Sequence, residues 1–132
     1  MINPEFWIRL GGIYFLLFGV FHLTFWRLFE WPVRLAGIDR INRGIMQTLN
    51  VCLTFLFFLA GILLLFYTTE VRHTGLGRTL LAGSGLFWLT RAILQLLWFP
   101  LRPALSRGLL ILFVAGAGIF FTPLILMISG IH

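Results

Sequence analysis

Seven polar side chains inside or beside apolar segments are the residues of this chain that could do chemistry. A histidine can exchange a proton or ligate a metal, an arginine can bind an anionic or carbonyl oxygen, and an amide can both donate and accept hydrogen bonds. Several of them recur at steps of three or four residues, which places them on one face of a helix. The candidate site residues are His22, Glu30, Arg43, Gln47, Asn50, Arg91 and Gln95.

Catalytic and metal-binding patterns of known kinds are missing from the sequence. Metal sites need clustered ligands, and His22, His73 and His132 are far apart in the chain, so we predict no metal site and no haem held by two histidines. His22 alone could ligate a chlorophyll-type pigment, although a histidine satisfied within the protein core is the simpler interpretation. The apolar segments hold no acid that could relay protons. The sequence therefore names no cofactor, and it leaves open whether the protein is an enzyme.

The composition requires an apolar solvent. The 132 residues are 60% hydrophobic and 11% charged, whereas soluble domains carry roughly 25% charged residues. The net charge of +6 comes from ten arginines against four acids. The arginines lie mostly in short segments between apolar runs, which is typical of membrane-flanking charge and not of a basic face that binds nucleic acid.

Four apolar segments are each near the ~20 residues needed to cross a hydrocarbon core about 30 Å thick. They cover residues 6–26, 45–67, 80–99 and 109–128. Their connections are short, and short connections make consecutive helices antiparallel neighbours. We therefore predict an all-α fold, an antiparallel four-helix transmembrane bundle in which residues 1–132 form a single membrane domain.

Aromatic and basic residues predict how the bundle sits in the membrane. Tryptophan and tyrosine favour the interface between lipid and water. The connections after the first and third segments hold six arginines, and the other side holds three, so the positive-inside rule places both termini outside the cytoplasm. The predicted interface anchors are Trp7, Trp26, Trp31, Tyr67 and Trp98.

The seven polar residues are expected to converge in one leaflet. In an antiparallel bundle, the end of the first segment, the start of the second and the end of the third lie at the same level. Arg91 costs from ~2.5 to more than 10 kcal/mol if it faces lipid, so it should face the other polar groups. Two interpretations stay open: a polar pocket that a ligand can enter, or a hydrogen-bond network that holds the helices together while Arg91 reaches towards the headgroups.

The first half of the chain has a recognisable pattern: His22 and the aromatics after it, then Glu30 and Trp31, then Asn42 and Gly44 at the start of the second segment. In this pattern it resembles a family of small bacterial four-helix membrane proteins with no established activity. The chain departs from the family after the glycine, where it reads Ile-Met-Gln. The resemblance implies a bacterial inner membrane and carries over no activity.

Two functions from different classes fit the sequence. The first is a non-catalytic integral membrane protein, an accessory or structural subunit that packs against other transmembrane chains or against copies of itself. The second is a binding protein or enzyme whose polar pocket takes a lipid, a quinone or a pigment. In both, the partners are membrane lipids and transmembrane chains, and nucleic acid is not among them.

Overall fold

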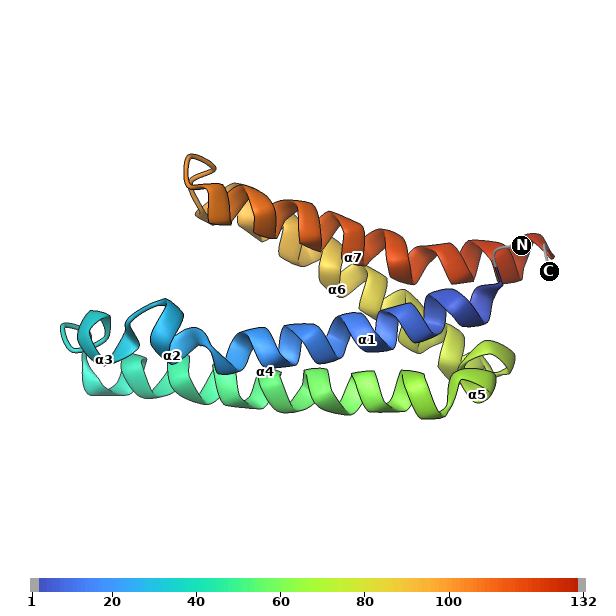
Figure 1. Ribbon diagram of the computed structural model, residues 1–132, viewed down its shortest axis with the longest axis horizontal. Helices are drawn as coiled ribbons and strands as arrows, with labels where there is room; N and C mark the ends of the chain where they lie inside the picture. Colours follow the sequence, from blue (N-terminus) through green and yellow to red (C-terminus); the bar gives the residue numbers. More distant parts are fainter. Residues whose placement is uncertain (1–2, 131–132) are drawn as a thin grey trace. The chain divides into compact units, whose positions relative to one another are not determined.

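The structure, a computed structural model, describes residues 3–130, and every regular element in that range is a helix. Four of the helices are long and apolar enough to cross a membrane. The predictions of an all-helical fold and of four apolar spans are therefore confirmed. The helices are α1 (Pro4–Leu23), α2 (Phe25–Leu28), α3 (Trp31–Arg34), α4 (Arg40–Phe66), α5 (Thr68–His73), α6 (Gly75–Trp98) and α7 (Ala104–Ser129) (Figure 1).

Three of the long helices begin five residues before the apolar segment that predicts them. Helices α4, α6 and α7 start at residues 40, 75 and 104, where hydropathy places the starts at 45, 80 and 109. For α4 and α6, a side chain that caps the backbone N–H groups lets the helix begin outside the apolar run, whereas α7 begins after Pro103 with no side-chain cap. Thr74 caps α6 in this way, its hydroxyl accepting from the Gly77 N–H at 3.0 Å.

Asp39 caps α4 with a charged group. Its carboxylate accepts from the backbone N–H of Ile41 at 3.1 Å, and from the backbone N–H of Asn42 at 3.0 Å and that residue's side-chain amide. These hydrogen bonds, those from Asn42 above all, favour the ionised carboxylate and lower the pKa of Asp39.

The first apolar segment ends sooner than expected. Helix α1 ends at Leu23 instead of continuing to residue 26, and the chain re-forms a single turn as α2. The hydroxyl of Thr24 donates to the Phe21 carbonyl at 2.6 Å, and the Thr24 N–H donates to the same carbonyl at 3.0 Å. A carbonyl bonded in this way closes the last turn of α1.

The chain divides into two compact units. The first unit contains the residues up to Gly11 together with those from Leu64 onward, and the second contains Gly12–Leu63. Helices α1 and α4 each contribute to both. The single membrane domain expected from the sequence stays a prediction.

In the second unit, α1 and α4 pack side by side in opposite directions (Figure 1). His22 of α1 meets Asn50 early in α4, whereas Gly12 lies beside Gly61 near its end. A side chain at Gly61 would come within 2.9 Å of the Gly12 carbonyl oxygen. The glycine therefore allows the close approach of these two backbones.

In the first unit, α6 and α7 form a second antiparallel pair, drawn in yellow and in orange to red in Figure 1. The rings of Trp88 and Phe113 stack with centroids 5.8 Å apart. Gly77, at the start of α6, lies so close to α5 that an added Cβ would overlap the backbone of Val71. Only glycine fits there.

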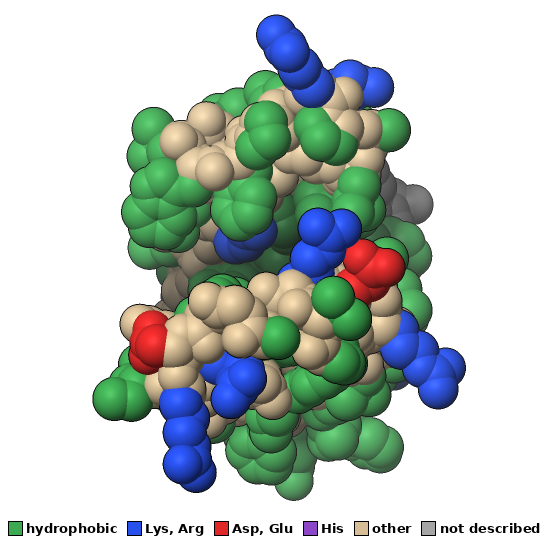
Figure 2. Space-filling model, turned by 90° about the vertical axis from the view of Figure 1, so that its left-hand side faces the viewer, with side chains coloured by type: hydrophobic (Ala, Val, Ile, Leu, Met, Phe, Trp, Pro, Cys, Tyr) green, Lys and Arg blue, Asp and Glu red, His purple; other side chains and the backbone are tan. Residues whose placement is uncertain are grey.

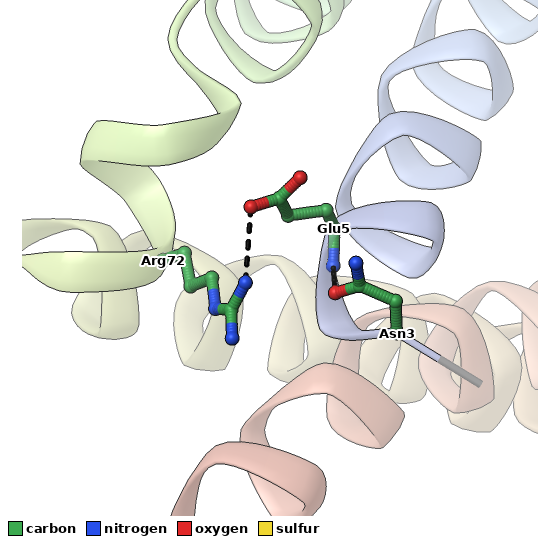
Figure 3. Close-up of polar contacts among 3 residues, drawn as sticks. All are labelled: Asn3, Glu5 and Arg72. Carbon is green, nitrogen blue, oxygen red and sulfur yellow. Dashed lines mark hydrogen bonds and ion pairs between the residues drawn. The ribbon is translucent and has the colours of Figure 1, made fainter. Parts of the chain in front are cut away.

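The start of α1 is tied to α5 within the first unit (Figure 3). Asn3 caps α1 by accepting from the Glu5 N–H at 3.0 Å, and Pro4 occupies the first helical position, which it favours. The Glu5 carboxylate also accepts from the Arg72 guanidinium at 3.0 Å. The two side chains are only 32% and 21% exposed, respectively.

Large apolar side chains cover the outside of the long helices. Phe55 of α4, Leu97 of α6 and Ile111 of α7 are each more than 60% exposed. The end of the molecule drawn in Figure 2 carries hydrophobic side chains as well, with basic and acidic ones projecting among them. Cys52 is exposed as well. A surface of this kind suits lipid as the surrounding solvent.

Candidate functional site

His22 and Asn50 form a two-way hydrogen-bonded contact in the second unit. The Asn50 side-chain Nδ2 donates to the backbone carbonyl of His22 at 3.1 Å, and His22 Nδ1 lies 2.8 Å from Asn50 Oδ1. The His22 carbonyl belongs to the last turn of α1, where carbonyls have no partner within the helix. Asn50 thus caps the end of α1 from a neighbouring helix.

The same contact assigns the protons of the imidazole. A carbonyl oxygen only accepts, so the Asn50 amide must present its Nδ2 to the His22 carbonyl. Its Oδ1 then faces His22 Nδ1, which must carry the hydrogen and donate. The neutral imidazole is therefore the Nδ1–H tautomer, and Nδ1 is committed to holding α1 against α4.

Aromatic rings and one hydroxyl surround this pair. The His22 ring stacks on Phe25 with centroids 4.2 Å apart and meets the edge of Phe57 at 5.1 Å. Buried Thr54 donates to the Asn50 carbonyl at 2.7 Å, a bond within α4 that keeps its hydroxyl satisfied. Asn50 is buried and His22 is half-buried against these rings, so water competes less for their hydrogen bonds than at an exposed site.

The other three candidate residues of the second unit make no hydrogen bond with this pair among those the structure shows. One lies between α2 and α3, and two lie on α4 before Asn50. Glu30 pairs with Arg34 at 3.2 Å, and both side chains are more than 60% exposed. Its backbone has φ of 51°, which turns the chain between α2 and α3. Arg43 and Gln47 are half-buried on α4, two turns and one turn before Asn50.

Arg91 and Gln95 lie one turn apart on α6 in the first unit. The Arg91 guanidinium carbon lies 4.3 Å from the ring centroid of Phe113 and 5.3 Å from that of Phe99. Gln95 is 1% exposed, and its Nε2 lies 2.7 Å from the Ser106 hydroxyl and 3.4 Å from the Ser106 carbonyl. Each residue is therefore held by α7 or by the end of α6.

The structure brings together His22 with Asn50, and it places Arg91 and Gln95 on one hairpin. The convergence of both sets in one leaflet stays a prediction. Sequence reasoning missed Ser106, Phe113 and Phe99 as contacts. The signal for Ser106 was its spacing of seven from Phe113, which puts both on one face of a helix once α7 is known to begin at residue 104.

The expected interface anchors occupy different environments. Tyr67 and Trp98 are exposed at helix ends, at 52% and 72%. Trp26 and Trp31 meet edge to face at 5.1 Å between α2 and α3. Trp7 is half-buried on α1, and its Nε1 has no hydrogen-bond partner among residues 3–130. Their role at a membrane interface stays a prediction.

Across residues 3–130, no three side chains of His, Cys, Asp or Glu lie close enough together to hold a metal ion. His132 lies outside the described residues. Comparison of the chain with models of known families, with curated proteins and with solved structures finds no match. The resemblance to small bacterial membrane proteins stays a prediction.

Proposed function

We propose that this protein is a non-catalytic integral membrane protein, an accessory or structural subunit that packs against other transmembrane chains or a second copy of itself. In this proposal α1, α4, α6 and α7 cross the membrane as an antiparallel bundle. The length and apolar character of these helices support it, as do the antiparallel contacts within each unit.

One observation carries the packing function: two glycines in the middle of long helices face open space. An added Cβ at Gly83 of α6 or Gly118 of α7 would meet no atom within 4 Å. Glycine inside a helix costs roughly 0.5–1 kcal/mol relative to alanine, and here no contact within residues 3–130 explains that cost. In membranes, small residues at such positions let a neighbouring helix approach closely.

The His22–Asn50 pair supports a structural role. His22 uses Nδ1 and its backbone carbonyl on Asn50 of the neighbouring helix, and Asn50 uses both polar atoms on His22. This arrangement is the hydrogen-bonded helix contact that stabilises membrane bundles.

Location and orientation belong to the same proposal. We place the protein in a bacterial inner membrane, with both termini outside the cytoplasm. The support is the excess of arginine at the ends of the apolar segments: six arginines lie between the first and second apolar segments or between the third and fourth, and three lie on the other side. Membrane lipids surround the helices in this arrangement.

The packing function is tested by adding bulk at the open glycines. The full chain is purified in a mild detergent, and its association is measured by light scattering and by energy transfer in liposomes. Gly118→Leu is expected to weaken association by tenfold or more, equivalent to about 1.4 kcal/mol. The helical content should be kept, because a Cβ at this position has no atom of residues 3–130 within 4 Å.

The matched control is Gly108→Leu, which also meets nothing within 4 Å but lies in the second turn of the same helix. It should leave association unchanged. A parent protein that is monomeric in liposomes at every density, and that co-purifies with no transmembrane chain, would remove the basis of the proposal. Equal loss in both variants would show that the effect is not one of helix packing.

A further inference from the structure

At the end of the α6–α7 hairpin, a charged side chain has an incomplete set of hydrogen-bond partners. Arg91 is half-buried between the rings of Phe113 and Phe99. Its Nη1 is buried and makes no hydrogen bond to any of residues 3–130. Aromatic faces attract the guanidinium, yet they accept none of its N–H groups in the way an oxygen does.

No acid of the described chain is available as the counter-ion. Glu5 pairs with Arg72, Glu30 pairs with Arg34, and Asp39 binds Asn42. The fourth acid, Glu70, lies in α5, and the 16 residues of α6 up to Arg91 add about 24 Å. The segment from α6 to the end of α7 contains no acid at all, but it contains four arginines.

Gln95 shows a second incomplete group in the same turn. One polar atom of its amide faces Ser106, and the Oε1 is buried without a hydrogen-bond partner in residues 3–130. Rotating the amide would exchange the two atoms and leave the Nε2 in that position instead. A buried polar atom left without a partner costs about 1–3 kcal/mol. The hairpin therefore leaves polar groups for something outside it to satisfy.

The position along α6 indicates where that partner comes from. Arg91 is seven residues, about 10 Å, before Trp98, and Trp98 is exposed at the helix end as residues of the lipid–water interface are. The guanidinium lies against Phe99, beyond Trp98 in the chain, so it reaches towards that end of the helix. Arg102 and Arg107 add positive charge in and beside the α6–α7 connection.

We propose that Arg91, held between Phe113 and Phe99 with Gln95 beside it, binds the phosphate of an anionic phospholipid. The planar guanidinium suits a phosphate oxygen pair. A headgroup arriving from the membrane supplies the anion that the chain lacks, and its acyl chains can lie along the exposed apolar surface of the hairpin. This inference goes beyond the packing function, because it assigns a ligand and requires no second transmembrane chain.

The experiment uses the full chain in dodecyl maltoside, with phosphatidylglycerol, phosphatidylcholine or inorganic phosphate added. Thermal melting and native mass spectrometry report binding. Phosphatidylglycerol should raise the melting temperature and remain bound, phosphatidylcholine should do so less, and inorganic phosphate should have no effect. Arg91→Gln should weaken the apparent affinity for phosphatidylglycerol about tenfold, because it removes a charge-assisted hydrogen bond.

Arg102→Gln is the matched control, since it removes the same charge from the exposed connection of the same hairpin. It should retain most of the phosphatidylglycerol effect. Arg91→Lys keeps the charge but loses the planar fork, and it should bind with intermediate affinity. If Arg91→Gln does not fold, the proposal is still tested by the affinity of the lysine variant and by whether the parent binds phosphatidylglycerol more tightly than phosphatidylcholine.

Three results would overturn the proposal. The parent could fail to distinguish phosphatidylglycerol from phosphatidylcholine, which would move the missing anion to a carboxylate of a partner chain. Arg102→Gln could lose as much binding as Arg91→Gln, which would mean attraction to net charge alone. Inorganic phosphate could stabilise the parent as well as the lipid does, which would make the ligand a soluble anion. None of these results bears on the association of the glycine variants.

Discussion

The two units differ in how far their buried polar side chains are hydrogen-bonded. In the second unit, His22 and Asn50 satisfy each other across α1 and α4, through both polar atoms of the amide. In the first unit, Arg91 and Gln95 each retain a buried atom with no hydrogen-bond partner among residues 3–130. A polar side chain inside an apolar helix can therefore be satisfied within the protein in one place and keep an unsatisfied polar atom in another. The difference is whether the neighbouring helix supplies a matching polar group.

The largest effect is expected from Asn50→Leu. The change keeps the volume but removes both partners of His22, leaving its Nδ1–H and its carbonyl without Asn50. Two such losses should lower the free energy of unfolding by about 1–3 kcal/mol. The value is measured by unfolding the protein from mild detergent with increasing dodecyl sulfate.

The same measurement on Gln95→Met compares the first unit with the second. This change removes the Oε1 that has no partner together with the Nε2 bonds to Ser106. Because these two effects oppose each other, without added lipid it should alter the free energy of unfolding by less than about 0.5 kcal/mol. Replacing His22 and Asn50 together by leucine should cost less than Asn50→Leu and His22→Leu summed, because neither polar side chain then remains without the other and only the carbonyl of residue 22 loses its bond from Asn50. Equal losses from Asn50→Leu and Gln95→Met would contradict the comparison.

A smaller effect is expected from the ion pairs. Glu5–Arg72 in the first unit is mostly sheltered, whereas Glu30–Arg34 in the second unit is 64% and 72% exposed. A double-mutant cycle with Glu5→Gln and Arg72→Met should give a coupling energy of about 1 kcal/mol, and the matching cycle at Glu30 and Arg34 about 0.3 kcal/mol.

The two coupling energies should also respond differently to salt. Raising the sodium chloride concentration screens exposed charges more than sheltered ones, so the Glu30–Arg34 coupling should vanish first. A larger coupling at Glu30–Arg34 than at Glu5–Arg72 would show that exposure does not rank these pairs.

The smallest effect concerns pH and the helix caps. Helix α4 is capped by the carboxylate of Asp39, whose pKa is lowered by its bonds to Asn42, while α6 is capped by the uncharged hydroxyl of Thr74. A lowered pKa means that the cap contributes fully above the pKa of Asp39 in the unfolded chain. Its contribution is lost as the pH falls through the lower pKa of the folded protein.

Hydrogen exchange measures this difference between the caps. On acidification, after correction for the intrinsic exchange rate, the amides of Ile41 and Asn42 should lose protection while that of Gly77 keeps it. Asp39→Asn retains a capping oxygen without the titrating charge, and it should abolish the pH dependence at α4. Protection at Ile41 that does not vary with pH in the parent would contradict the role given to Asp39.

Hydropathy and spacing predicted the four long helices, because lipid-facing segments must satisfy their backbone internally and so leave a long apolar signal. The helix starts were missed, since capping by Asp39 and Thr74 extends helices into polar sequence. Spacing also placed Asn50 at the level of His22 and Arg91 beside Gln95. It could not show that Asn50 uses both its polar atoms on His22, because that depends on where α1 ends, at Leu23.

Ser106 and Phe113 could not be assigned to Gln95 and Arg91 from the sequence, because the start of α7 sets their register and no apolar signal marks it. Glu30 was expected among the polar groups of the helices, but its left-handed backbone conformation turns the chain and pairs its carboxylate with Arg34. A single residue with positive φ gives almost no sequence signal when it is not glycine.

The early start of α4 has a consequence for how the helices match the thickness of the bilayer. Its 27 residues span about 40 Å and the 20 residues of α1 about 30 Å, so the helices differ by roughly 10 Å while a hydrocarbon core measures about 30 Å. In the proposed bundle, α1 alone matches the core. Helix α4 must tilt or extend past it, and its polar first turns, with Arg40 and Arg43, are the part suited to extend. A change in bilayer thickness would then affect the helices differently, because α1 is the shortest span and has no length to spare.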